Sequence, residues 1–218
     1  MDRFQFERDL LNRGIKRIAG VDEAGRGPLA GPVVAAAAVL PPVWMESGLP
    51  VALRGLNDSK QLSATQREKF FAFLASSGEF LYGVAVIEAQ VIDTINILRA
   101  THQAMREALE ELRPAPDHVL VDGLPVPSLR LAHTSLVRGD ARSYSIAAAS
   151  ILAKVSRDRL MLEYDRQYPL YGFAEHKGYG TPRHLAALAD HGPCPIHRRS
   201  FAPLKEPEPE LFASRGRK

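Results

Sequence analysis

The sequence has little cysteine and no long hydrophobic run. Cys194 is its one cysteine among 218 residues, which excludes an intrachain disulfide and favours a reducing compartment. The longest apolar run, VVAAAAVL at 33–40, is far too short to cross a bilayer. The N-terminal stretch MDRFQFERDLLNRG is charged throughout and contains no signal-peptide core. These absences predict a soluble, cytoplasmic protein without a membrane partner.

A strong overall charge is also lacking, because 28 Lys and Arg face 25 Asp and Glu for a net charge of +3. The charges are unevenly placed. Residues 142–205 contain ten basic against five acidic side chains, whereas residues 1–141 contain fifteen against seventeen. A basic final third favours a polyanionic partner, although a solvated basic surface explains the charge equally well.

Length and composition indicate an ordinary globular protein. The chain of 24.0 kDa, with 45% hydrophobic and 24% charged residues, fits one medium domain that can bury a core. Internal repeats are absent from the sequence. The sequence is silent on oligomeric state, for which a monomer is the default expectation.

Short runs of Val, Ile and Ala, bounded by Gly and Pro, predict the first strands. Residues 17–22, 31–40 and 80–87 indicate three strands joined as a meander, the first two through the turn EAGRGPLAG. Ser63 and Gln66 form a capping box, which predicts a helix that stops at a glycine fifteen residues later. The pattern leaves open whether this helix packs on the sheet or beside it.

Helices and strands alternate after this meander. Apolar positions recur with a helical period from about 90 to 112. HVLVDG (118–123) and LRLAH (129–133) predict two further strands, and the Ala-rich segment 142–167 predicts a long helix that ends before a proline. A short helix is expected in TPRHLAALADHG. This order indicates an α/β domain with a mixed sheet.

Four acidic residues stand at the ends of these predicted elements. Asp22 and Glu23 end the first strand, Asp122 ends VLVD, and Asp140 precedes the long helix. Each one alone is explained as a turn or N-cap residue. Together, three or four carboxylates at the tips of adjacent strands suit two hard cations such as Mg²⁺ or Mn²⁺, which support in-line displacement at phosphorus.

The neighbours Asp22 and Glu23 are expected to differ in role. Adjacent strand residues point to opposite faces, so both side chains reach one point only if the strand ends between them. We therefore expect the Asp22 side chain to be the ligand, with Glu23 binding through its carbonyl or holding a water. Cations would also reconcile these acids with the glycines that follow, because glycines suit a phosphate that bare acids repel.

Motifs in a fixed order carry a resemblance to a known family. They are GVDEAGRGPLAGPVVAAAAVL (20–40), DSKQLS (58–63), INILRATHQAM (95–105), DG (122–123), RGDARSYSIAAASILAKVSRD (138–158), YGFAEHKGYGT (171–181) and GPCPIHRRSF (192–201). Together they resemble bacterial ribonuclease HII, the type 2 ribonuclease H family, from about residue 15 to residue 204. The ordered set is far more specific than any single pattern in it.

The resemblance implies an RNase H-like fold, with a central mixed sheet flanked by helices and a small helical C-terminal extension that binds substrate. We accordingly expect an N-terminal lead-in helix over 1–16, a catalytic core over 17–168 and a basic substrate-binding segment over 169–204. The tail 205–218 has no apolar periodicity and is expected to be disordered.

The implied activity is that of a ribonuclease H with two divalent ions, Mg²⁺ or Mn²⁺, in its site. Such an enzyme hydrolyses RNA strands paired to DNA and cuts 5′ to ribonucleotides embedded in duplex DNA, leaving 3′-hydroxyl and 5′-phosphate ends. Asp22 and Asp122 would hold one ion, and Asp22 and Asp140 the other. Two alternatives stay open: a metal nuclease of the same fold that acts on DNA alone, and a non-catalytic module that binds hybrids.

The resemblance also implies roles for individual residues. The family's four catalytic and metal-binding acids fall on Asp22, Glu23, Asp122 and Asp140. Its Gly-Arg-Gly motif, which senses the ribonucleotide 2′-hydroxyl, falls on Gly25, Arg26 and Gly27, its sugar-stacking tyrosine on Tyr179, and its lysine near the substrate phosphates on Lys60. The family often has lysine where Arg138 and Arg142 stand, a departure that keeps the charge.

The residues of the Gly-Arg-Gly motif have a physical reading of their own. Glycine lets backbone approach a sugar closely, and the 2′-hydroxyl is what distinguishes RNA from DNA. Arg26 reaches a phosphate or braces the loop, or it forms a salt bridge with Glu23 or another acid. Further candidates for phosphate contacts are Lys154, Arg157, Lys177, Arg183, Arg198 and Arg199.

Overall fold

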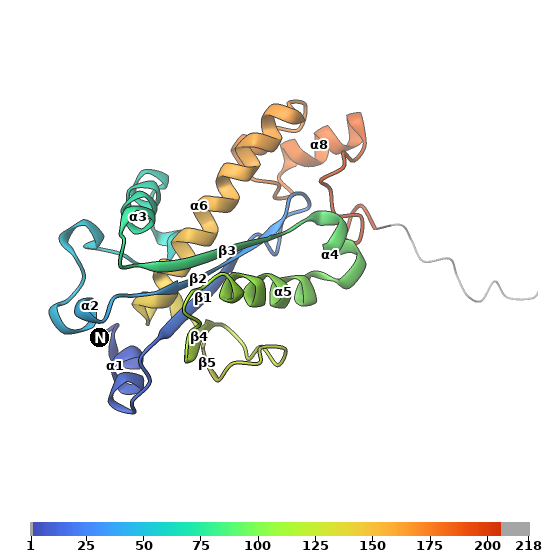
Figure 1. The fold of residues 1–218 in the computed structure, drawn as a ribbon. Helices are drawn as coiled ribbons and strands as arrows, with labels where there is room; N and C mark the ends of the chain where they lie inside the picture. Colours follow the sequence, from blue (N-terminus) through green and yellow to red (C-terminus); the bar gives the residue numbers. More distant parts are fainter. Residues whose placement is uncertain (1, 206–218) are drawn as a thin grey trace, which may run out of the picture.

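The short apolar runs of the sequence form the strands of a five-stranded mixed sheet (Figure 1). β1 (Ile18–Ala24), β2 (Val33–Val39) and β3 (Leu81–Ile87) make the expected antiparallel meander. β4 (His118–Asp122) and β5 (His133–Leu136) continue the sheet in parallel on the other side of β1, in the order β3-β2-β1-β4-β5. The α/β class with a mixed sheet is confirmed.

This computed structural model describes residues 2–205. The tail predicted over 205–218 therefore lies outside the described residues, apart from its first residue. The helices of the described part are α1 (Gln5–Asn12), α2 (Pro42–Ser47), α3 (Ala64–Ser76), α4 (Ala89–Ile95), α5 (Ile97–Glu110), α6 (Tyr144–Gln167), α7 (Phe173–His176) and α8 (Pro182–His191). None of them has the length and apolarity needed to span a membrane.

Helices cover both faces of the sheet, which is why β2 is apolar and buried at every position. Val33 and Ala35 point into the core beneath α5, and Ala36 and Ala38 point into the core beneath α6. Small residues allow the helices to lie close. A Cβ built on Gly20 of β1 would lie 2.1 Å from the backbone carbon of Ser145 in α6. The position of α6 against β1 is thus fixed by backbone contact.

Two predicted helices form as expected. Ser63 and Gln66 make the capping box of α3, which packs against α6 and contributes buried Phe70 to the core on that side of the sheet. Thr181 is the N-cap of α8, and Gly192 is its C-cap. The side on which α3 packs, which the sequence pattern left open, is therefore that of α6.

The helix predicted over 90–112 is wrong as a single element. The structure divides it at Asn96, which has a φ of 69° and separates α4 from α5. The Asn96 side chain accepts a hydrogen bond from the amide of Arg99 at 3.1 Å and so caps α5. The apolar period continues through this break because Ile92 of α4 and Met105 of α5 are buried in the same core.

The strand predicted over 129–133 is also displaced. The parallel ladder with β4 begins at His133, which lies opposite Val119. Leu129 closes a turn by donating its amide to Val126 O at 3.0 Å, and Leu131 packs on the core beneath α5 from the same loop. Apolar side chains thus reach the core from irregular backbone, whereas the edge strand itself has the polar sequence HTSL.

The long helix α6 begins two residues later than predicted and ends as predicted. Its N-cap is Ser143, and Asp140 lies before it in a 3₁₀ turn, Gly139–Ala141. Buried Glu7 of α1 accepts hydrogen bonds from the hydroxyls of Ser143 and Ser145, at 2.6 and 2.7 Å. A carboxylate at a helix N-terminus is favourable, so α1 helps to fix the start of α6 and the turn before it.

Candidate metal and substrate site

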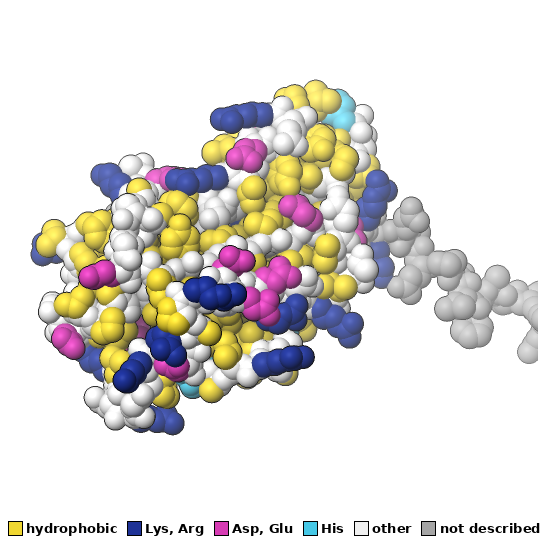
Figure 2. Space-filling view, in the orientation of Figure 1, with side chains coloured by type: hydrophobic (Ala, Val, Ile, Leu, Met, Phe, Trp, Pro, Cys, Tyr) yellow, Lys and Arg dark blue, Asp and Glu magenta, His cyan; other side chains and the backbone are white. Residues whose placement is uncertain are grey.

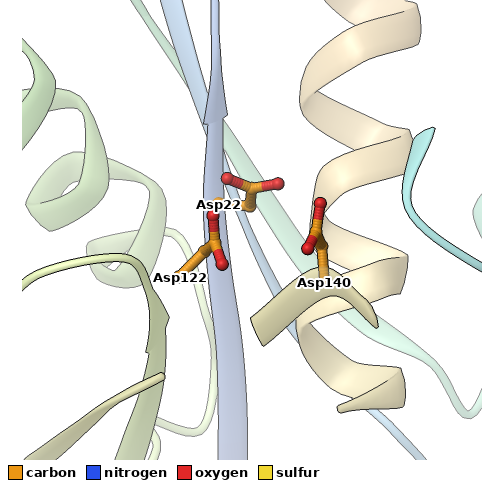
Figure 3. A group of neighbouring side chains, drawn as sticks. All are labelled: Asp22, Asp122 and Asp140. Carbon is orange, nitrogen blue, oxygen red and sulfur yellow. The ribbon is translucent and has the colours of Figure 1, made fainter. Parts of the chain in front are cut away.

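Three aspartates from three separate elements converge at one edge of the sheet (Figure 3). Val21 of β1 pairs with Val121 of β4 in a parallel ladder, so Asp22 and Asp122 leave neighbouring strands at the same level. Asp140 reaches them from the turn before α6. Carboxylate oxygens of Asp22, Asp122 and Asp140 all lie within 4.8 Å of one another, and we call these residues the three-aspartate cluster.

Backbone amides orient each carboxylate of this cluster. Asp122 Oδ1 accepts from the amide of Gly139 at 2.6 Å, Asp140 Oδ1 from Ala141 at 2.8 Å, and Asp22 Oδ1 from Glu23 at 2.7 Å. The bond to Gly139 links β4 directly to the turn that contains Asp140. The cluster is therefore held by main-chain contacts from its own elements.

Glu23 does not belong to the cluster, although it lines the same hollow as Asp22. Its carboxylate forms an ion pair with Arg26 at 3.3 Å. Of the three readings of Arg26, the structure therefore shows the pair with Glu23. The separation of the two neighbouring acids follows the alternation of side chains along β1.

Burial and mutual repulsion make the ionised cluster costly. Burial, followed by the charges of Glu23 and Asp122, raises the pKa of Asp22 well above its ordinary value. Burial and the charges of Asp122 and Asp58 raise the pKa of Asp140 to about 6. Burial also raises the pKa of Glu23, although the nearby Arg26 lowers it in part. Cations would relieve this repulsion.

The raised pKa of Asp140 predicts that Asp140→Asn stabilises the metal-free protein at pH 8. A carboxyl whose pKa is raised by folding stabilises the fold below about pH 4, and this contribution is lost as the pH rises through about 6. Asparagine cannot ionise, so the variant should gain about 1–2 kcal/mol at pH 8 and almost nothing at pH 4. Urea unfolding in EDTA at both pH values measures the difference.

Asp190→Asn, at an exposed position of α8, is the matched control for that measurement and should change stability little at either pH. Adding Mg²⁺ should reduce the difference in unfolding free energy between Asp140→Asn and the wild type at pH 8, because a cation that binds the folded wild type stabilises it. An Asp140→Asn variant no more stable than wild type at pH 8 would show that Asp140 carries no repulsive strain.

A hollow of about 260 Å³ adjoins the cluster. The Gly-Arg-Gly segment Gly25–Gly27 lines one side, Tyr179 another, and Lys60 and Lys154 contribute positive charge. Tyr179 is 47% exposed. Its Cε1 would lie 3.6 Å from a Cβ built on Gly27, so the ring and the glycine backbone face one space.

Lys60 is electrostatically tied to the acids across this hollow. Partial burial lowers its pKa, but the carboxylates of Asp22, Asp58, Asp140 and Asp122 outweigh that effect and raise the pKa above its ordinary value. The Lys60 side chain is therefore a firmly charged cation beside the three-aspartate cluster. Such a cation can bind a phosphate that enters the site.

Of the other predicted contact residues, Arg157 lines this hollow, whereas Lys177, Arg183, Arg198 and Arg199 do not. Lys177 donates its Nζ to Ala174 O, and Arg183 forms an ion pair with Glu175. Arg199 is exposed, near the end of the described chain. Arg157 and Arg198 are 1% and 0% exposed. The burial of Arg198, which does not line the hollow, contradicts the prediction that it contacts phosphate, whereas for Arg157, which lines the hollow, that contact stays a prediction. Both guanidinium groups bind backbone carbonyls.

Sequence reasoning missed three polar residues of the site. Ser150 donates its hydroxyl to Ser59 Oγ at 2.9 Å, and both line the hollow beside Asp22. Asp58 lies close enough to Asp140 to contribute to its raised pKa. Ser59 and Asp58 stand in the DSK motif, which was noticed for its lysine alone, whereas nothing local in the Ala-rich helix distinguishes Ser150.

Comparisons with known proteins show what the whole chain is similar to. Residues 19–204 match the model of a family described as Ribonuclease HII. Ribonuclease HII of Ruminiclostridium cellulolyticum is 53% identical over 205 residues, covering 92% of this chain and 77% of the relative. Ribonuclease HII of Syntrophotalea carbinolica is 55% identical over 202 residues, 92% of either protein. The crystal structure of ribonuclease H2 from Pyrococcus horikoshii OT3 has a TM-score of 0.70 and 31% identity, covering 87% of this chain and 95% of that one.

Proposed function

The chain belongs to the ribonuclease HII family and is an endonuclease of the ribonuclease H type, and we propose that it cuts 5′ to ribonucleotides embedded in duplex DNA and hydrolyses RNA paired to DNA. The products would carry 3′-hydroxyl and 5′-phosphate ends. The observation that carries this proposal is the three-aspartate cluster beside a hollow lined by Gly25–Gly27 and Tyr179. The first part is suited to phosphate hydrolysis and the second to reading a sugar.

The donor set fits two Mg²⁺ or Mn²⁺ ions. The three-aspartate cluster offers oxygen atoms only, which hard divalent cations prefer. Burial and the neighbouring acidic charges raise the pKa of Asp22 and of Asp140, and bound cations would offset that cost of ionisation. Asp22, Asp122 and Asp140 would hold the ions, with Glu23 contributing through its carbonyl or a water. When bound, such ions lower the pKa of water and stabilise charge on a leaving oxygen.

The remaining residues of the hollow bind and orient the nucleic acid. Lys60 and Lys154 attract phosphate oxygens, which offsets the repulsion by the aspartates. Gly25 and Gly27 present bare backbone to the sugar, where amides and carbonyls can bond a 2′-hydroxyl. Tyr179 presents an exposed ring on which a sugar or base can stack. Catalysis then rests on positioning in addition to charge.

We further propose that residues 17–168 form the catalytic core and residues 169–204 the segment that grips the duplex. On the face shown in Figure 2, basic side chains lie scattered among acidic and apolar ones. We expect phosphate binding to depend on individual residues near the hollow, and Lys177 and Arg183 would extend it along the duplex. We expect binding to weaken steeply with salt, and we expect the enzyme to act as a cytoplasmic monomer.

A comparison of two duplexes tests the proposal. A duplex with one ribonucleotide should be cut on the 5′ side of that residue in Mg²⁺ or Mn²⁺, whereas an all-DNA duplex of the same sequence should be cut at least about 10³-fold more slowly, as expected when a site built for a hydroxyl meets its absence. End-labelled products resolved at nucleotide resolution give the position and the ends.

EDTA is the control for metal dependence in that assay and should abolish cleavage. Equal cleavage of both duplexes would assign the chain to the DNA-directed alternative. Tight binding of the ribonucleotide duplex with no cleavage in either metal would favour the hybrid-binding module instead.

A further inference from the structure

Two arginines are buried behind the Gly-Arg-Gly segment without a carboxylate partner. Arg157 of α6 and Arg198 near the C-terminal end are 1% and 0% exposed, and neither forms an ion pair with any of the residues 2–205. Burying an unpaired cation is costly unless its donors are well satisfied. Burial lowers the pKa of Arg157 to about 10 and that of Arg198 to about 9, so both remain charged near neutral pH. The hydrogen bonds of these two side chains give a structural reason for burying them.

The guanidinium of Arg198 donates hydrogen bonds to three backbone carbonyls of one loop. Its Nη2 donates to Gly25 O at 2.5 Å, its Nη1 to Arg26 O at 2.9 Å and its Nε to Gly31 O at 3.0 Å. The guanidinium also lies over the ring of Phe201, 5.1 Å from its centroid. We call residues 25–32 the recognition loop. A planar fork with fixed donors matches such a set of carbonyls, and no other side chain offers one.

Arg157 joins the same loop to the Tyr179 segment. Its Nε donates to Pro32 O at 2.9 Å and its Nη2 to Ala30 O at 3.2 Å, both in the recognition loop. Its Nη1 donates to Lys177 O at 3.1 Å, two residues before Tyr179. One side chain therefore joins the two segments that contribute Gly25–Gly27 and Tyr179 to the hollow.

Main-chain bonds complete this connection. Leu29 donates its amide to Gly178 O at 2.8 Å, Arg198 to Leu29 O at 2.8 Å, and Gly31 to Ile196 O at 2.9 Å. The recognition loop is thus bonded on one side to the residue preceding Tyr179 and on the other to the segment that ends in Arg198. The three segments come from widely separated parts of the sequence.

A chain of buried histidines fixes the backbone of Tyr179 itself. The amide of Cys194 donates to His197 Nδ1 at 3.0 Å, so the proton of neutral His197 is on Nε2. That nitrogen lies 3.0 Å from His184 Nε2, which must accept, and His184 Nδ1 therefore donates to Tyr179 O at 2.9 Å. This assignment makes His184 a donor to the carbonyl of Tyr179, which also accepts the amide of Thr181 at 2.8 Å.

We propose that Arg157 and Arg198 are positioning residues that join the recognition loop and the Tyr179 segment into one rigid unit for reading the ribonucleotide. This inference rests on the proposed function, because it assigns the unit to ribonucleotide recognition. The unit holds the Gly25–Gly27 backbone and the Tyr179 ring at a fixed separation, so that a sugar bonded by one is stacked on the other. Neither arginine touches the reacting phosphate.

Arg198→Lys and Arg198→Met test the proposal, with Arg54→Met as the matched control. The control removes the same charge from an exposed arginine that lies outside residues 169–204 and does not line the hollow. Single-turnover cleavage of a duplex with one ribonucleotide should fall about 100-fold in both Arg198 variants, because lysine keeps the charge but not the fork, and a misplacement of about 1 Å costs that much. The control should stay within about twofold of wild type.

A second readout separates this role from general stability and from metal binding. Mn²⁺ binding to the substrate-free protein should be unchanged in the Arg198 variants, because Arg198 contacts none of the three aspartates. Wild-type cleavage and selectivity in Arg198→Lys would overturn the proposal. Loss of Mn²⁺ binding together with cleavage would overturn it as well, by making the arginine a support of the whole site.

Native-state hydrogen exchange of the wild type keeps the proposal testable if these variants do not fold. Four hydrogen-bonded amides report on the unit, those of Leu29, Gly31, Tyr179 and Arg198. Their exchange should give one common free energy of opening with one dependence on denaturant concentration, as expected of a single cooperative unit. Independent openings of the recognition loop and the Tyr179 segment would refute a rigid unit. If the wild type cleaved both duplexes equally, the proposed function would be refuted. The exchange result would still show whether the recognition loop and the Tyr179 segment form one unit.

Discussion

Replacing Asp122 by asparagine is expected to lower the single-turnover cleavage rate by about 10³-fold or more, equivalent to about 4 kcal/mol of transition-state stabilisation. Asp122 Oδ1 accepts the amide of Gly139 at 2.6 Å, a bond that the asparagine oxygen can keep. The substitution therefore removes one charge from the three-aspartate cluster while it preserves the contact between β4 and the turn of Asp140. What is lost is the capacity to hold cations.

The measurement is cleavage of the ribonucleotide-containing duplex in saturating Mg²⁺ or Mn²⁺, with thermal unfolding of the same sample as a check on the fold. Asp190→Asn, which is exposed on α8, serves as the control and should cleave as the wild type does. Relief of repulsion should leave Asp122→Asn at least as stable as wild type without metal. Cleavage within tenfold of wild type would remove Asp122 from the proposed metal site.

The strands and the acids at their ends could be predicted because their signals are local. Val, Ile and Ala runs marked β1, β2, β3 and β4, and Asp22 and Asp122 stand where those runs end. That the two aspartates lie side by side depends on the pairing of Val21 with Val121, a contact across one hundred residues that no local pattern specifies. The expectation of one shared site came from acids at the tips of predicted adjacent strands, and the family resemblance implied the same residues.

Elements whose boundaries depend on tertiary packing were predicted less well. The break at Asn96 lies inside an unbroken apolar period, because both α4 and α5 bury the same side against the sheet. β5 has a polar sequence because it is an edge strand with half-buried side chains, whereas the apolar Leu129 and Leu131 that suggested a strand lie in the loop before it. Hydrophobicity reports burial, and burial does not require a strand.

The burial of Arg157 and Arg198 could not be predicted from the sequence. Charge favours the surface, so a sequence reader assigns Arg157 and Arg198 to solvent or phosphate. Only the fold shows that the carbonyls of the recognition loop converge on them. A signal did exist: the loop from Gly25 to Pro32 is rich in glycine and proline, and such a segment has few internal bonds, so its carbonyls need donors from elsewhere.

Gly25→Ala and Gly27→Ala are expected to fail for different reasons. Gly25 has a φ of +94°, and a Cβ there would lie 2.0 Å from Arg157 Nε and 2.7 Å from Pro32 O. The alanine therefore strains the backbone and displaces the arginine that braces the loop, which should cost about 2–4 kcal/mol of folding stability. Cleavage should fall with it, because the recognition loop is displaced.

Gly27→Ala should leave stability within about 0.5 kcal/mol of wild type, because the nearest atom to the new Cβ is Tyr179 Cε1 at 3.6 Å, an ordinary contact. Its methyl group nevertheless projects into the space between loop and ring, where the proposed sugar lies. We expect kcat/KM for the ribonucleotide duplex to fall about 10- to 100-fold. Urea unfolding and cleavage, measured on both variants, separate the two effects. Unchanged cleavage by Gly27→Ala would mean that no sugar approaches the backbone there. Loss of stability in Gly25→Ala together with loss of cleavage alone in Gly27→Ala would show that the first glycine is needed for folding and the second for substrate access.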